Sequence, residues 1–165
     1  MFLLTFTILD TFAGAQDLEQ PSWGTRIDEV RSMIQQEPDV EESDLLLYEG
    51  YNFGDMVATV GYVFNRRQRL IKRSYVFHQD YRDPHQYILD KVNMKNQLDM
   101  IYGSMEMKAN WKDPRYSGDV ALLGEAVLNG ALEIVTVWYD NNSAIVLTLR
   151  GDDGRARMVL DYVRK

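Results

Sequence analysis

The chain has 165 residues, 45% of them hydrophobic, and a formal net charge of -7 at pH 7. This length and composition predict one globular domain. The acidic charge argues against general nucleic-acid binding, which needs a basic surface facing the phosphates. The absence of cysteine excludes disulfides, thiolate zinc sites and cysteine nucleophiles from the chain.

The N-terminus carries a candidate export signal. Residues 2–9, FLLTFTIL, form a short apolar run, and Ala13-Gly14-Ala15 supplies the small-x-small pattern of a secretory cleavage site. We therefore expect a signal peptide over residues 1–15, a linker over residues 16–21, and a periplasmic or secreted mature protein. The alternative is a cytosolic protein with an amphipathic or unstructured tail, because no Lys or Arg precedes the run and Asp10 interrupts it. The run is too short to span a bilayer and no later stretch qualifies, so we expect no transmembrane segment.

The first half of the domain predicts a helix followed by strands. Thr25 is a good N-cap, Asp28 stands three residues later in an acidic variant of the capping box, and Pro38 ends the helix. Apolar residues recur at helical spacing and predict one buried stripe: Ile27, Val30 and Ile34. After an acidic connector, the expected elements are a strand at 45–48, a turn at 50–54, and strands Met56–Phe64 and Leu70–Phe77 paired as a hairpin across 65–69.

The second half predicts the same order with clearer helix signals. Asp83 caps the second helix, Pro84 opens it, Gln86 completes a capping box, and Gly103 supplies a left-handed C-cap. Its apolar face is predicted to contain Tyr87, Ile88, Met94, Leu98, Ile101 and Tyr102. The piece up to Trp111 has a weak pattern and residues 121–130 are ambiguous, while strands are expected at Leu132–Tyr139, Ala144–Leu149 and Met158–Val163.

These elements predict an α+β fold in a single domain over residues 22–165. Two units of similar layout, about 22–80 and 81–165, each place a helix before an antiparallel meander. A capped helix with an apolar stripe needs a surface to cover, so we expect the helices to pack on one face of an antiparallel sheet.

The two halves also resemble known exported proteins. The resemblance rests on Gly24-Thr25, Val30, Pro38, Leu47-Tyr48, Tyr62-Val63-Phe64 and Leu70 in the first half, and on Tyr102-Gly103, Trp111, Trp138 and Ile145 in the second. The first set resembles the G-[ST]-x-x-x-x-V…P…Y…Y-x-F…L pattern of SmpA/OmlA-type proteins, whose tandem form is seen in β-lactamase-inhibitory-protein-like domains. The second set is similar to the C-terminal unit of uncharacterised exported proteins with this doubled layout. The resemblance implies a small exported module that binds other proteins, and it supplies no catalytic residue.

Two polar clusters are candidates for ligand binding. His78 and His85 lie near Asp80 and Asp83, a combination that can bind zinc, but helix-start signals already explain their spacing, so no metal or cofactor is expected. The basic run Arg66 to Arg73 is compatible with a phosphate or anionic-lipid contact. We favour a hairpin tip and charged edge strand, paired internally with acidic residues of the connector: Glu37, Asp39, Glu41, Glu42 and Asp44.

No catalytic motif appears in the sequence. The adjacent Asp152 and Asp153 lie in a predicted turn, where two carboxylates rarely converge on one substrate atom. The sequence therefore favours a non-catalytic protein.

Four aromatic residues are the candidate binding site. Tyr51 and Phe53 lie in a predicted loop, and Trp111 and Tyr116 flank another, where aromatics commonly anchor protein interfaces. The alternative is that these rings fold back over the core. The expected function is an exported, non-catalytic protein-interaction module whose partner is another protein of the cell envelope. The alternative is a small-ligand-binding protein or weak enzyme, which would need a pocket of at least ~300 Å³ between helices and sheet.

Overall fold

The computed structural model of the protein describes residues 20–152 and 154–165. The helices are α1 (Ile27–Met33), α2 (His85–Tyr102) and α3 (Leu123–Leu128), with short 3-10 turns η1 (Pro114–Tyr116) and η2 (Val120–Leu122). The strands are β1 (Val40–Glu42), β2 (Leu45–Phe53), β3 (Met56–Phe64), β4 (Leu70–Phe77), β5 (Lys108–Trp111), β6 (Leu132–Tyr139), β7 (Ser143–Asp152) and β8 (Arg155–Arg164). The predicted α+β class is confirmed. The expected signal peptide and most of the linker lie outside the described residues.

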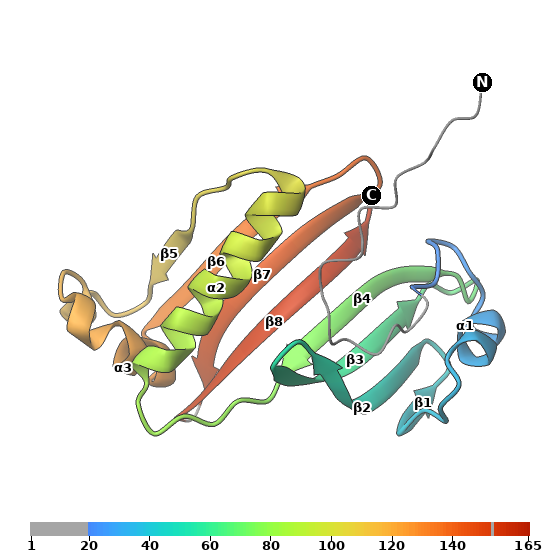
Figure 1. The fold of residues 1–165 in the computed structure, drawn as a ribbon, viewed down its shortest axis with the longest axis horizontal. Coiled ribbons are helices and arrows are strands. Elements are labelled where there is room, and N and C mark those ends of the chain that lie inside the picture. The colour runs from blue at the N-terminus through green and yellow to red at the C-terminus, as the bar shows by residue number, and fades with distance from the viewer. Residues whose placement is uncertain (1–19, 153) are drawn as a thin grey trace.

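The strands form one eight-stranded antiparallel sheet in the order β1-β2-β3-β4-β8-β7-β6-β5. Strands β4 and β8 pair in the middle, with Tyr75 opposite Leu160, and so join the two halves of the chain (Figure 1). The predicted hairpin of β3 and β4 and the predicted bounds of β6 are confirmed. The prediction that Arg66 to Arg73 ends in an edge strand is wrong, because β4 lies between β3 and β8.

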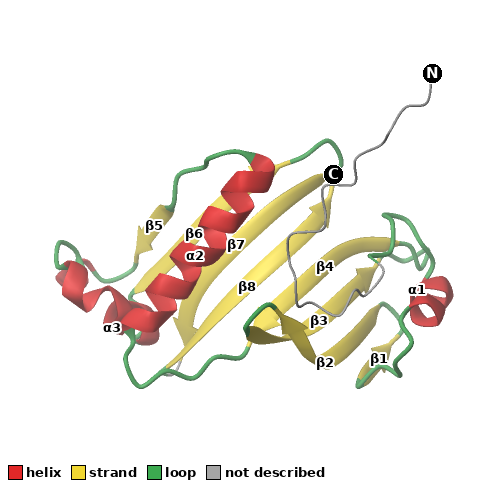
Figure 2. Cartoon of the chain, in the orientation of Figure 1, coloured by secondary structure: helices red, strands yellow, loops and turns green. Residues whose placement is uncertain are grey.

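Helix α2 crosses the half of the sheet formed by β6, β7 and β8, and α3 packs beside it (Figure 2). The buried positions of α2 are Tyr87, Ile88, Lys91, Met94 and Leu98. Ile101 was expected on this face but is 47% exposed, because it lies in the last turn of the helix. Gly103 is the C-cap as predicted and has a positive φ of 91°, but its ψ of 156° lies outside the left-handed helical conformation that was expected.

Helix α1 differs from the prediction at both ends. Its N-cap is Arg26, whose backbone N–H donates to the Glu29 carboxylate, so the capping box does not use Thr25 and Asp28. The Thr25 hydroxyl instead donates to the carbonyl of Ser22. The helix ends at Met33, well before Pro38.

Strand β2 continues through the segment that was predicted to be a turn. Tyr48 pairs with Val60 and Tyr51 with Ala58, so β2 contains one extra residue between these pairs. Gly50, with a φ of 70°, adopts the left-handed conformation that such a bulge requires. Because one inserted residue reverses the alternation of side chains, Tyr51 points to the same face as Tyr48 rather than away from it.

Two further differences concern short elements. The ambiguous residues 121–130 form η2 and α3, and the acidic connector contributes the edge strand β1. Helix α2 begins at His85, one residue after Pro84. The N-cap is therefore Pro84 rather than the predicted Asp83. The Asp83 carboxylate still accepts the His85 N–H, and the backbone N–H of Gln86 donates to the Asp83 carbonyl.

Candidate functional site

The two faces of the sheet have different surroundings. On β6, β7 and β8 the buried side chains point towards α2. On this face Thr136 of β6 lies opposite Leu147 of β7, which in turn lies opposite Leu160 of β8. The alternate positions point the other way and are half-buried or exposed. We call this second surface the open face.

The open face carries many apolar side chains around a central polar cluster. Its apolar side chains come from five strands: Val57 and Val63 of β3, Val76 of β4, Val159 and Val163 of β8, Ala144 and Val146 of β7, and Val135, Val137 and Tyr139 of β6. Tyr139 is 59% exposed and Val57 is 43% exposed. Exposed apolar side chains that gather on one face of a sheet can mark contact with another macromolecule.

Charged groups divide the open face into a paired centre and a basic end. In the centre, Lys72 lies 3.0 Å from Asp161, which also accepts the Ser74 hydroxyl at 2.6 Å. At the hairpin end, Arg150 and Arg157 are directly opposite each other on β7 and β8, and both are exposed. Like charges in opposed positions repel, so an anionic group placed over this pair would relieve the repulsion.

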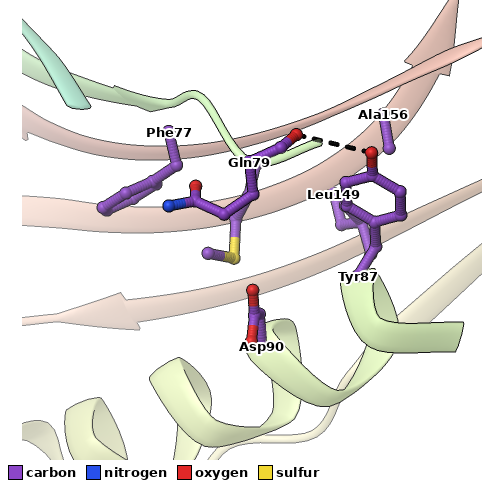
Figure 3. Close-up of a pocket in the computed structure, with 7 residues that line it drawn as sticks. Phe77, Gln79, Tyr87, Asp90, Leu149 and Ala156 are labelled. Atoms are coloured by element: carbon purple, nitrogen blue, oxygen red, sulfur yellow. Dashed lines mark hydrogen bonds between the residues drawn. The ribbon is translucent and has the colours of Figure 1, made fainter. Parts of the chain in front are cut away.

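The space between α2 and the sheet is almost completely filled. A small cavity there has a volume of about 10 Å³ and is lined by Phe77, Gln79, Tyr87, Asp90, Leu149, Ala156 and Met158 (Figure 3). Tyr87 donates to the carbonyl of Gln79 at 3.4 Å, and the neighbouring Tyr81 hydroxyl donates to Asp90 at 2.5 Å. Burial, together with this hydrogen bond, raises the pKa of Tyr81 to about 12, so its hydroxyl remains protonated at neutral pH. A cavity of this size suffices for about one water molecule.

The four predicted aromatic anchors do not form one site. Tyr51 and Phe53 lie on β2 rather than in a loop, are half-buried, and pack with Tyr75 at ring-centroid distances of 6.0 and 5.3 Å. Trp111 ends β5 at the opposite edge of the sheet, and Tyr116 lies in η1. All four pack against the core, which agrees with the alternative that the sequence left open.

The two histidines lie in different local surroundings. The His78 Nε2 atom is 2.7 Å from the Thr59 hydroxyl, and His85 begins α2 with its N–H bonded to Asp83. Within residues 20–152 and 154–165 no group of three or more His, Asp or Glu side chains gathers to hold a metal ion.

The basic run is paired internally, but not with the acidic connector. Arg69 donates to the Gly24 carbonyl at 3.1 Å, and Lys72 pairs with Asp161. The Arg73 guanidinium lies over the rings of Trp23 and Tyr162, at 4.8 and 5.2 Å from their centroids. The predicted connector partners are therefore wrong.

Sequence reasoning missed two features. The open face depends on strand register, which the predicted pairings did not specify. The other feature is an ionic network on the inner side of α2, where Asp99 accepts from the Lys95 ammonium, the Trp138 N–H and the Met105 N–H. Burial opposes ionisation of Asp99, but these three donors outweigh it and lower its pKa below the ordinary value.

No protein-family model, curated protein or solved structure matches the chain. Among the described residues, no helix has the length and apolar character that crossing a bilayer requires.

Proposed function

We propose that the protein is an exported, non-catalytic interaction module that binds another protein through the open face of its sheet. The observation that carries this proposal is the contrast between the two faces. Over β6, β7 and β8 one face is covered by α2, while the other face carries apolar side chains from five strands that are half-buried or exposed.

The small cavity beneath α2 argues against a small-ligand site between the helices and the sheet. Ligand pockets typically have volumes of ~300 to 1,000 Å³, whereas the cavity between α2 and the sheet has about 10 Å³. A sheet face without a pocket can still bind a protein, because protein interfaces depend on area and on a few well-packed side chains.

The resemblance to SmpA/OmlA-type and β-lactamase-inhibitory-protein-like modules supports the same proposal. In this reading the two units, about 22–80 and 81–165, place their helices on one face so that the other remains available to a partner. Because the candidate signal peptide at residues 1–15 would export the protein, we propose that the partner belongs to the cell envelope.

The charges of the open face define the partner further. The partner's contact surface combines apolar side chains with at least one carboxylate opposite Arg150 and Arg157, since an anion there offsets the repulsion between the two guanidinium groups. Charge complementarity of this kind increases the association rate and makes binding weaken as salt is raised.

Site-specific photo-crosslinking in cells of the native host tests the proposal. A photoreactive residue at Val57 or Tyr139 probes the open face, and one at Asn93 or Gln97 probes the exposed side of α2 as a matched control. We expect one common adduct from both open-face positions and none from the controls.

The charge-reversed variant Arg150→Glu/Arg157→Glu is expected to lose this adduct while its unfolding midpoint stays within a few degrees of wild type, because both side chains are exposed. Adducts from the control positions alone would contradict the proposal. For export, mass spectrometry of the protein from its host is expected to find a chain beginning at Gln16, and intact Met1 in the cytosol would contradict that part.

A further inference from the structure

Lys91 occupies an unusual position for a lysine. It lies in the middle of α2 on the side facing the sheet, and its exposed fraction is 0%. Its Nζ donates to the hydroxyl of Thr136 on β6 at 2.7 Å, and Thr136 is itself 1% exposed. Lysine is almost never fully buried unless its charge is paired, so the neighbours of Nζ decide which form it takes.

No carboxylate of the described residues forms an ion pair with the Nζ of Lys91. The carboxylate that acts on it, Asp99, already accepts from Lys95, Trp138 and Met105. Lys95 also adds a second positive charge on the same side of the helix.

The elements packed against α2 bring no other counter-charge. On β6 the residues that face the helix are Ile134, Thr136 and Trp138, on β7 they are Ile145, Leu147 and Leu149, and on β8 they are Met158, Leu160 and Tyr162. The Tyr162 hydroxyl is the titratable group among them, and burial raises its pKa well above 10, so it stays neutral. On α3 the buried residues are Gly124, Ala126 and Val127, while Glu125 is exposed.

These surroundings favour the neutral amine. Removing an ammonium from water without a counter-ion is costly, whereas an amine can keep its hydrogen bond to a hydroxyl. Burial, followed by the nearby charge of Lys95, lowers the pKa of Lys91 to about 7 despite the opposing effect of Asp99.

We propose that α2 is a proton-sensitive latch: it is held on β6–β8 while Lys91 is neutral, and protonation of Lys91 loosens it. Loosening exposes the apolar inner face of α2 and the strand residues beneath it, including Trp138 and Leu147. This proposal concerns the helix-covered face of the sheet and is independent of binding at the open face.

The direction of the pH effect follows from the two protonation states. When α2 is open, Lys91 is solvated and keeps its proton up to its ordinary pKa of 10.5, whereas the closed form releases the proton above about 7. Between these values the open form binds one more proton, so opening becomes about tenfold less favourable for each unit of rising pH. Below about pH 7 both forms are protonated, and α2 is held most weakly.

Native-state hydrogen exchange of the full chain measures this opening. After correction for intrinsic exchange, we expect the protection factors of the α2 amides, such as those of Met94 and Leu98, to rise about 100-fold between pH 6 and pH 9. They are also expected to stay below the protection factor of Leu147 in β7, because the helix opens without the rest of the sheet. In Lys91→Met the rise is expected to disappear, while in Lys112→Met, which changes an exposed lysine, it is expected to persist.

Two further measurements keep the test decisive if Lys91→Met folds poorly. The variant Lys91→Met/Thr136→Val removes both polar partners together, which costs less than leaving the hydroxyl unpaired. In the wild-type protein, nitrogen-15 NMR of the Lys91 Nζ is expected to titrate near pH 7.

Three results would overturn the proposal: a Lys91 Nζ that titrates near its ordinary pKa, an unchanged pH profile in Lys91→Met, or α2 amides that exchange only together with those of β7. Each of them leaves the open-face adducts unaffected, so failure of the latch and failure of the proposed function are distinguishable.

Discussion

The close packing of α3 on the sheet makes Gly151 the position least able to accept a side chain. A Cβ atom added to Gly151 would stand 1.8 Å from the carbonyl oxygen of Val127 and 2.9 Å from the Cα of Leu128. Both atoms belong to the backbone of α3, so no side-chain rotation relieves the contact. Gly151→Ala therefore requires α3 to move away from the sheet by more than about 1 Å, in an interior that is packed like a crystal.

The expected loss follows from what α3 buries. Ala126 and Val127 are both fully buried, and full burial of a valine side chain contributes ~1.5 to 3 kcal/mol, with about 0.8 kcal/mol more for the alanine methyl. Losing most of this gives a destabilisation of ~3 kcal/mol, at the upper end of the usual range for overpacked cores. For a domain of this size that corresponds to a fall in Tm of ~6 to 12 °C.

Gly61→Ala is the matched control, because Gly61 is also a strand glycine without a positive φ. Its added methyl would meet the flexible end of Leu47 at 3.1 Å, which can shift. We expect this variant to stay within ~1 kcal/mol of wild type in urea unfolding followed by circular dichroism. If Gly151→Ala matched Gly61→Ala in the same assay, α3 would not be seated against β7 as described, and the reasoning would be refuted.

Further changes test the packing of Tyr51 and Phe53, the Asp99 network and the histidines. Tyr51→Ala and Phe53→Ala are each expected to lower the free energy of unfolding by ~2 kcal/mol, because the rings pack against the core; an unchanged urea midpoint would place them on the surface instead. Trp138→Phe removes a hydrogen bond to a carboxylate and is expected to cost ~1.5 to 3 kcal/mol at pH 7. The lowered pKa of Asp99 stabilises the fold at neutral pH, and this stabilisation is lost as the pH falls through the pKa of Asp99 in the folded protein. Since Trp138→Phe removes one of the donors that lower this pKa, its acid unfolding is expected to begin at higher pH. Addition of zinc is expected to leave the Tm unchanged, and a rise that disappears in His78→Ala would show a metal site.

The strands whose side chains alternate could be predicted from the sequence. The bounds of β3 and β4 agree with the prediction because Met56–Phe64 and Leu70–Phe77 are rich in β-branched and aromatic residues and flank a polar turn. The pattern does not say which strands pair outside a hairpin. The β4–β8 pairing, which makes one sheet of the two halves, joins residues more than 80 positions apart, such as Tyr75 and Leu160.

The error at Tyr51 and Phe53 has a specific physical cause. Gly50 and Gly54 both favour turns, and two glycines four residues apart suggest a loop. In the structure Gly50 forms a bulge and only Gly54 belongs to the turn, so the strand continues between them. The bulge then moves both aromatic rings to the core face. A glycine in a strand pattern can therefore indicate either a bulge or a turn, and the pairing with the neighbouring strand determines which of the two forms.

Lys91 shows the same limit on a helix. Its position falls on the buried stripe, because Tyr87, Lys91, Met94 and Leu98 follow one another at spacings of three or four residues. A lysine on such a stripe is ordinarily taken to extend its ammonium into solvent at the side of the helix. The ammonium can reach solvent only if one side of the helix is uncovered next to the lysine. Here β6–β8 lie beneath α2 and α3 lies beside it. The sequence therefore carries the signal, a cation on an apolar stripe, but the covering that makes the cation costly comes from elements 30 to 70 residues farther along the chain. Because these elements bury Lys91, we propose that its protonation determines whether α2 stays packed on the sheet.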